Sequence, residues 1–402
     1  MNIVLQNACF PELVEWTEEL AGFRRDIHAH PELGFETART CAKIVETLKS
    51  WGIESVDAET VKGGVLVVIE GSRPGKTVAL RGDIDALPMN DASENAWKST
   101  VAGRCHACGH DGHATWLLGA LRYLHVHNDF PGRVLGIFQP AEESGGGALS
   151  VCDSGVFERL GVKEIYGAHD EATLPKGVVG FCYGPAQASV DFFYITMKGV
   201  GTHGARPHLG VDPVPAAAEL VHTLQTIVSR KVDPIEKAVV SVCSINAGSY
   251  RAANVIPAEA TLSGTIRTFN EDVRRQIAQE MERMTAAVAS ANGCTAELTI
   301  RRMTPSVYNH PETTQAMADF VKRTFGPEYA KEDWPLSMGG EDFAEYQLRI
   351  PGSIVRIGIR DENHRVSIHN PTFDFNDELI AAGSTLLAGV ARERLEALAR
   401  KE

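Results

Sequence analysis

Cysteine, histidine and acidic side chains are concentrated in residues 105–113, which read Cys-His-Ala-Cys-Gly-His-Asp-Gly-His. Thiolate and imidazole groups are ligands that Zn²⁺ and similar transition metals prefer. Cys105 and Cys108 also have the C-x-x-C spacing of a redox pair, but the second cysteine pair of a zinc ribbon is absent. A polar helix N-terminus would explain Asp111, but not three histidines and two cysteines together. The stretch therefore predicts a metal site.

Two pairs of acidic residues follow predicted strands on either side of this stretch. Asp83 and Asp85 share one face at the end of a strand, and Glu142 and Glu143 come directly after another. Open α/β sheets bind their ligands at the carboxyl ends of the strands. Neighbours on a regular strand point in opposite directions, so one glutamate can face a metal while the other faces its water. Taken alone, the glutamate pair is better explained as a solvated turn.

Two single histidines complete the candidate ligands. His169 lies at the end of an apparent strand over residues 164–170, and His369 lies in a turn over residues 367–371. Either histidine alone is better explained by a structural role.

The spacing of apolar residues predicts the elements that position these groups. Helical spacing covers residues 13–27 and 38–48, strands are predicted at 65–70, 77–83 and 133–140, and a helix at 111–126. This alternation predicts α/β layers around a largely buried, partly parallel sheet.

The order of predicted elements changes between residues 185 and 303. The elements are a strand at 191–199, a helix near 213–230, strands at 238–245 and 260–269, a helix at 271–292 and a strand at 295–301. This βαββαβ order is that of a ferredoxin-like α+β unit. The first pattern then resumes and ends in a long helix, 376–400. We therefore predict a catalytic α/β domain in two parts, 1–184 and 304–402, interrupted by an inserted domain, 185–303.

Composition excludes several classes of protein. The 39 Lys+Arg against 52 Asp+Glu give a formal charge of −13. A protein with this negative charge does not attract nucleic acid or an anionic membrane. The sequence has no run of about 18 apolar residues, so no membrane span is predicted. The N-terminus lacks the pattern of a secretion signal. The eight scattered cysteines do not form a disulfide framework. These features predict a cytoplasmic globular protein.

A set of motifs in order along the chain resembles the amidohydrolase branch of the aminoacylase/carboxypeptidase-G metallopeptidase family. That branch includes hippurate hydrolases, auxin–amino-acid conjugate hydrolases and N-acyl-amino-acid amidohydrolases. The resemblance runs from about residue 20 to 390, and its motifs here are RGDIDALP, HACGHDGH, FQPAEES, a strand-borne histidine, THGARPH, NVIPAEATLSGTIR, SMGGEDFA and IHNPTFDFND.

The resemblance implies two divalent metal ions per subunit, Zn, Mn, Co or Ni. The thiolate of Cys108 would bridge them. Glu143 and His369 would complete one metal, and His110 and His169 would complete the other. A mixed sulfur, nitrogen and oxygen site suits these ions better than Mg²⁺ or Ca²⁺.

The resemblance also implies the catalytic chemistry. Glu142 would be the general base that takes a proton from a metal-activated water and returns it to the leaving amine. Asp85 would orient a ligand histidine from behind. Cys105, His106 and His113 are expected to be structural or to support the ligands.

The inserted domain is similar to the family's dimerisation domain. His203 would stabilise the oxyanion by reaching across a homodimer, which can also be part of a tetramer. Asn254 and Arg267 match positions of substrate-contacting or structural polar residues, and Arg267 would hold a substrate carboxylate or form an ion pair within its strand. Gly340 is expected where the backbone approaches the ligand closely.

The chain departs from the family pattern directly after His169. The family commonly continues with an apolar residue, whereas this sequence has Asp170, with Lys176 a few residues later. Asp170 either hydrogen-bonds an imidazole or alters the charge near the substrate, or it turns outward, since strand neighbours alternate.

The leading hypothesis is hydrolysis of the amide bond of an N-acyl amino acid or related conjugate, a small molecule that carries a carboxylate. The alternatives on the same metal site are a dipeptidase and a hydrolytic deaminase of an aromatic acid. A non-catalytic metal-binding dimeric scaffold is a further alternative, which the presence of Glu142 disfavours because a scaffold needs no base beside its ligands.

Overall fold

Two units, each with its own sheet and hydrophobic core, make up the part of the chain that the computed structural model describes, residues 3–401. Unit 1 comprises the chain up to Gly184, then Tyr308–Pro335 and the chain from Asp342 onward. Unit 2 comprises Pro185–Val307 and Leu336–Glu341. The second segment of unit 2 was not expected, and it belongs there because Ser337 pairs with Gln187, far from it in sequence.

Unit 1 is built on an eight-stranded mixed sheet. Its strands are β1 (Val56–Asp57), β2 (Val65–Glu70), β3 (Arg73–Asp83), β4 (Pro131–Gln139), β5 (Val162–Pro175), β6 (Val179–Gly180), β15 (Ala330–Lys331) and β16 (Gly352–Arg360). They lie in the order β1-β2-β4-β3-β5-β16-β6-β15. The central strands β4, β3, β5 and β16 are parallel to one another, whereas β2 and β6 flank them antiparallel. The buried apolar runs of the central strands are typical of a sheet covered on both faces.

Parallel pairing brings the candidate residues to one edge of this sheet. Asp83, the last residue of β3, is paired with Gln139, the last residue of β4. On the other side, Arg81 of β3 is paired with Gly167 of β5, two residues before His169. The chain therefore leaves β3 and β4 beside the point where β5 carries its histidine.

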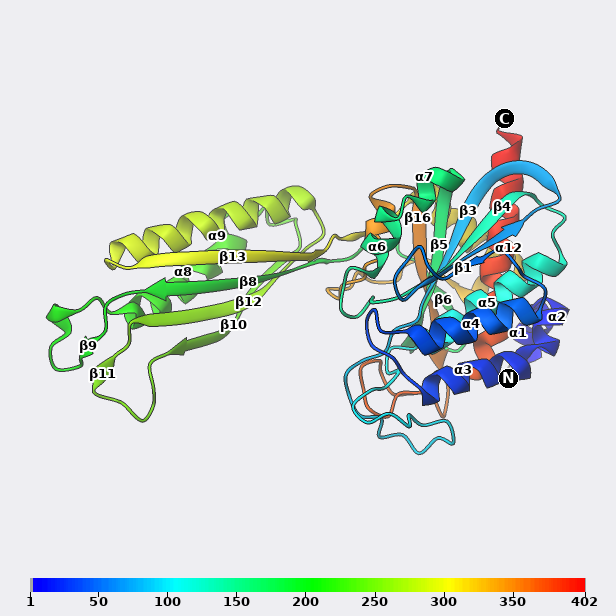
Figure 1. Cartoon of the computed structure of the whole chain (residues 1–402). Helices are drawn as coiled ribbons and strands as arrows, with labels where there is room; N and C mark the ends of the chain where they lie inside the picture. The colour runs from blue at the N-terminus through cyan, green and yellow to red at the C-terminus, as the bar shows by residue number, and fades with distance from the viewer. Residues whose placement is uncertain (1–2, 402) are drawn as a thin grey trace. The chain divides into compact units, whose positions relative to one another are not determined.

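Helices cover this sheet. They are α1 (Ile3–Ala8), α2 (Pro11–Glu15), α3 (Thr17–Ala29), α4 (Ala38–Ser50), α5 (His110–Val126), α6 (Gly147–Asp153), α7 (Val156–Leu160), α10 (Pro311–Thr324), α11 (Ala344–Gln347) and α12 (Ile380–Arg400). Helix α5 is buried almost all round and packs against α3, α12 and β3 (Figure 1). A helix buried on nearly every side belongs in a core, and its N-terminus lies at the edge of the sheet.

Unit 2 has the βαββαβ order predicted from the sequence. Its elements are β8 (Ser189–Lys198), α8 (Pro213–Arg230), β10 (Ala238–Ala247), β12 (Glu259–Thr268), α9 (Glu271–Ala291) and β13 (Thr295–Thr304). The antiparallel sheet has the order β10-β12-β8-β13, and α8 and α9 lie beside it (Figure 1). Apolar side chains of both helices pack on the sheet. A two-stranded ribbon, β9 (Thr202–His203) with β11 (Val255–Ile256), completes the unit.

The predicted fold class is confirmed: a mixed-sheet α/β domain contains an inserted ferredoxin-like unit. Two short strands, β7 (Gly184–Gln187) and β14 (Val307–Asn309), lie where the chain passes between the units. Within residues 3–401, none of the helices combines the length and the apolar character needed to cross a membrane.

Candidate metal and catalytic centre

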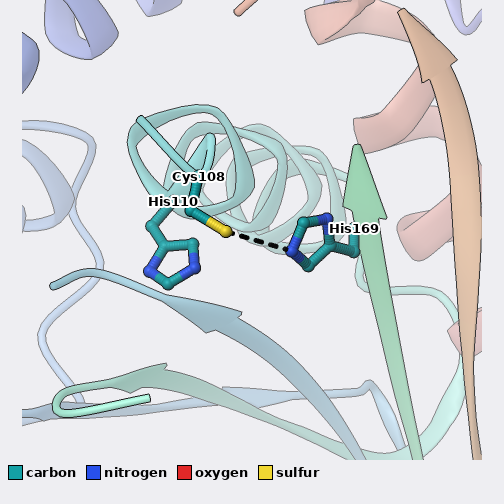
Figure 2. Close-up of side chains that lie close together, drawn as sticks. All are labelled: Cys108, His110 and His169. Atoms are coloured by element: carbon teal, nitrogen blue, oxygen red, sulfur yellow. Dashed lines mark hydrogen bonds between the residues drawn. The ribbon is translucent and has the colours of Figure 1, made fainter. Parts of the chain in front are cut away.

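Three potential metal ligands meet at the N-terminus of α5. Figure 2 shows Cys108 and His110 beside His169 of β5, with Sγ of Cys108 3.6 Å from Nε2 of His169. The three ligand atoms lie within 4.8 Å of one another, and all three residues are buried. The turn that presents them depends on Gly109, whose φ is +83° and where a Cβ would lie 2.3 Å from Oδ1 of Asp170.

A second group of potential ligands shares Cys108. It consists of Cys108, Glu143 and His369, whose ligand atoms also lie within 4.8 Å of one another. Nε2 of His369 is 3.4 Å from Oε1 of Glu143. His369 has a left-handed backbone, φ +61°, which is uncommon outside glycine, and its N–H donates to the carbonyl of Ala107 at 2.6 Å. Two groups that share one thiol suit two neighbouring cations.

Glu142 and Glu143 do not lie on a strand. Because β4 ends at Gln139, both glutamates lie in the turn that follows, which was one of the two alternatives considered, and not on a strand. Oε2 of Glu142 is 4.0 Å and Oε1 of Glu143 is 3.9 Å from Nε2 of His110. Both carboxylates therefore face the same side, next to the ligand histidine.

Asp85 contacts both the glutamate turn and His110. Its carboxylate accepts hydrogen bonds from the backbone amides of Glu142 and Glu143, at 3.0 and 3.2 Å. Its backbone carbonyl, rather than its carboxylate, is the nearer partner of His110, at 2.8 Å from Nδ1. Burial raises the pKa of Asp85, while the hydrogen bond from His110 opposes that rise.

The residues present fit a divalent metal. Nδ1 of His110 is bonded to the carbonyl of Asp85, and Nδ1 of His169 to the carbonyl of Asp170 at 2.7 Å. These bonds place the protons on Nδ1 and leave both Nε2 lone pairs for a cation. Nε2 of His110 is buried and has no hydrogen-bond partner among the described residues. Sulfur, nitrogen and carboxylate donors together suit Zn²⁺ and similar ions.

The electrostatics of the group agree with this fit. Burial raises the pKa of the Cys108 thiol well above its ordinary value, although His110 opposes the rise. Burial would also raise the pKa of Glu143, but its contact with His369 brings the pKa below the ordinary value. A buried thiolate needs a cation beside it, and the ionised Glu143 is ready to bind one.

Asp170, the departure from the family pattern, does not turn outward. Its side chain is fully buried, and Oδ1 lies 2.9 Å from Nε2 of His113. Nδ1 of His113 lies 2.7 Å from Oδ1 of Asp83. Burial alone would lower the pKa of His113, but the carboxylates of Asp83 and Asp170 raise it. Asp83, His113 and Asp170 thus form a continuous polar chain behind the ligands.

Arg24 was not identified from the sequence, although it supports the site. Its guanidinium is fully buried, 3.4 Å from Asp111 in the first turn of α5, and it donates to Asp374 and Asp377 at 3.0 and 2.7 Å. It therefore ties the start of α5 to the segment that follows His369. The available signal was a charged residue within the apolar stripe of α3.

Residues 79–393 match the family model described as peptidase family M20/M25/M40. The chain belongs to this family. It is 37% identical over 380 residues to an N-acetylcysteine deacetylase of Bacillus subtilis. The aligned residues cover 94% of this chain and 97% of that protein. It is also 37% identical over 383 residues to IAA-amino acid hydrolase ILR1-like 4 of Arabidopsis thaliana, covering 94% and 86% of the two chains.

A solved structure supports the same conclusion. A dinuclear metal-binding peptidase of the M20 family from Bacillus subtilis matches with a TM-score of 0.83 and 35% identity, over 95% of this chain and 99% of that one. The prediction of a metal-dependent hydrolase that acts on amide bonds is confirmed by family membership and by these relatives.

In this M20-family chain, unit 2 brings two of the predicted site residues together. His203 of β9 is exposed and is paired with Val255 of β11. The N–H of Gly204 donates to the carbonyl of Asn254 at 2.7 Å, so His203 and Asn254 lie at the same end of the ribbon. Nδ1 of His203 accepts from the N–H of Ala205 at 3.0 Å, which leaves Nε2 to donate.

Arg267 and Gly340 also lie in unit 2. Nε of Arg267 donates to Oγ1 of Thr265 at 3.1 Å, and Nη1 lies 3.5 Å from the carbonyl of Met338. These hydrogen bonds take the place of the ion pair considered from the sequence. At Gly340, a Cβ would lie 2.4 Å from Cγ2 of Val190, so packing within unit 2 is sufficient to require glycine there.

Proposed function

We propose that this protein hydrolyses the amide bond of an N-acyl amino acid or a related conjugate. Two divalent ions, from among Zn, Mn, Co and Ni, bind at the two groups that share Cys108. The observation that carries this proposal is the position of Glu142. It lies 4.0 Å from Nε2 of His110 and belongs to neither group that shares Cys108, although its carboxylate is also close to both His110 and Glu143. A carboxylate placed beside the ligands, yet outside both groups, suits a general base.

The cations, Glu142 and Asp85 have different roles in the proposed hydrolysis. The bound cations supply Lewis acidity, which lowers the pKa of a water and polarises the scissile carbonyl. Glu142, whose side chain is only 12% exposed, accepts the proton of the attacking water and delivers it to the leaving amine. Such general acid–base work contributes about 10²–10⁴-fold. Asp85 holds the turn of Glu142 in place through its backbone amides.

The activities for which the relatives are named support the substrate class. An N-acetylcysteine deacetylase and an IAA-amino acid hydrolase both act on an acyl group joined to an amino acid by an amide. Arg267, with its guanidinium only partly occupied by Thr265 and Met338, is proposed to hold the substrate carboxylate, because its planar fork matches a carboxylate. Asn254 and the backbone at Gly340 are proposed to contact the rest of the substrate.

We also propose a homodimer in which His203 of one subunit donates to the oxyanion in the other. The two edges of the unit 2 sheet differ: β13 carries Glu297, Arg301 and Arg302, whereas β10 carries no charged residue. Charges protect an edge strand from pairing with another chain, so β10 is the edge suited to a second copy. Two-fold dimers are the commonest oligomers.

A cytoplasmic location is part of the proposal. All eight cysteines are free, as is usual in a reducing compartment.

A screen of amine release tests the function. The metal-free protein is reloaded with each of the four metals and offered N-acyl amino acids, dipeptides and aminobenzoate-like acids, with Glu142→Gln protein as the matched control. We expect turnover of N-acyl amino acids by the wild type alone. Preferred turnover of dipeptides or aromatic amines would replace the proposed substrate class, and no turnover by a protein that has bound two metals would favour the scaffold.

A further inference from the structure

Asp170 contacts His169 through its main chain and its side chain. Its carbonyl accepts a hydrogen bond from Nδ1 of His169 at 2.7 Å, and its Oδ1 lies 3.3 Å from the same nitrogen. The main-chain bond fixes which nitrogen of His169 carries the proton. The carboxylate adds a negative charge behind the ring, on the side opposite the nitrogen that faces Cys108.

The carboxylate of Asp170 also packs against the turn that presents the other two ligands. Gly109 lies between Cys108 and His110, and a Cβ on it would lie 2.3 Å from Oδ1 of Asp170. The backbone joining these ligands therefore rests directly on the carboxylate.

The position of Asp170 is fixed from the other side by His113. This ring lies between Oδ1 of Asp170, at 2.9 Å, and Oδ1 of Asp83, at 2.7 Å. The chain of contacts joins the ends of β3 and β5 to the first turn of α5. Oδ2 of Asp170 is buried without a hydrogen-bond partner among residues 3–401. A buried carboxylate with one unsatisfied oxygen is costly unless positive charge lies nearby, and a cation at the neighbouring group would provide it.

We propose that Asp170 is a positioning residue that acts through His169. It holds the imidazole in its ligand orientation and strengthens cation binding at the group of Cys108, His110 and His169, but not at the group that contains Glu143 and His369. The inference rests on the proposed metal site and adds to it a residue that selectively tunes one of the two ions.

Titration of metal-free protein with Co²⁺, followed by the absorption of cobalt bound to thiolate, tests this proposal. Asp170→Asn keeps the volume and one oxygen acceptor, removes the charge and replaces the second oxygen with an NH₂ group. We expect the dissociation constant of one Co²⁺ to rise about 10–100-fold, the usual effect of losing a residue behind a ligand, while the other is unchanged. Glu171→Gln is the matched control, since it removes the next carboxylate, which bonds Thr173 instead.

Two further backgrounds distinguish a positioning role from general destabilisation. In His169→Ala protein, Asp170→Asn should have no further effect on Co²⁺ binding, whereas in Glu143→Gln protein the full loss should remain. Equal effects in both backgrounds, or unchanged affinity in Asp170→Asn, would overturn the inference. His113→Gln breaks the contacts behind Asp170 and should weaken the binding of the same single Co²⁺. This variant replaces Asp170→Asn in the test if Asp170→Asn does not fold. Wild-type protein that binds fewer than two Co²⁺ would instead overturn the proposed metal site.

Discussion

Oδ1 of Asp85 accepts a hydrogen bond from the backbone amide of Glu142 at 3.0 Å, and Oδ2 does the same for Glu143 at 3.2 Å. One buried carboxylate, two residues after the end of β3, therefore fixes the turn after β4. The proposed base and a proposed ligand depend on the same two hydrogen bonds, so their positions are coupled through Asp85.

We expect Asp85→Asn to lower kcat about 10²-fold, because an amide NH₂ facing a backbone N–H displaces the turn and a shift of about 1 Å near the chemistry has that cost. Steady-state kinetics checks this. Asp57→Asn is the control, since Asp57 also accepts two backbone amides, from Glu59 and Thr60, in an exposed turn. Wild-type kcat in Asp85→Asn would show that the turn is held by other contacts.

Glu142→Gln should retain both metal ions and lose about 10²–10⁴-fold in kcat, because the amide cannot accept the proton of water. Glu143→Gln should instead lose metal, since Glu143 belongs to a ligand group. Elemental analysis together with kinetics separates the two outcomes. Turnover near the wild-type rate in Glu142→Gln would contradict the proposed base.

Cys108→Ala should abolish binding of both ions, because both ligand groups share its sulfur. Cys105→Ala should keep most of the metal, as Cys105 is fully buried and belongs to none of the ligand groups described above. Metal content after dialysis checks both variants. The reverse result would make Cys105 the bridging ligand.

Mixing inactive Glu142→Gln with inactive His203→Ala should restore activity if His203 acts across the dimer. Each mixed dimer then has one subunit with Glu142 facing a partner with His203. If half the dimers are mixed, about a quarter of wild-type activity should return. Failure to recover, once exchange of subunits has been shown independently, would mean that His203 acts within its own chain or not at all.

His28 makes the free energy of unfolding depend on pH. Burial would lower its pKa, but Asp111, at 2.7 Å, raises it from 6.5 to about 9; Asp91 and Arg24 also face the ring. A raised pKa stabilises the folded state fully below the unfolded value of about 6.5, and this contribution disappears as the pH rises to about 9.

Urea unfolding at pH 6 and pH 9 measures this contribution. The stability difference between wild type and His28→Gln should shrink by about 3 kcal/mol over that range. A difference that stays constant with pH would mean that His28 is not protonated in the folded state.

The sequence placed four of the five candidate ligands near the boundaries of strands or helices, and the resemblance to the family implied which residues bind and added His369 in its turn. Cys108 and His110 precede an apolar helix, Glu143 follows a buried strand and His169 lies on another. Parallel neighbouring strands then bring such boundaries to one edge. The βαββαβ order of unit 2 was predictable for a similar reason, since each of its elements has a regular apolar period.

Side-chain directions at the site were decided by the tertiary structure. The sequence left open whether Asp170 turns outward or contacts an imidazole, and the first turn of α5 decides this, since the carboxylate meets His113 and Gly109. It also left open whether Glu142 and Glu143 alternate on a strand or lie in a turn; β4 ends before them and Asp85 sets their turn. The sequence by itself determined which donor atoms are present and which strand or helix end carries them. Contacts between segments far apart in the chain decided which way the side chains point, because a local pattern carries no information about the partners that packing supplies.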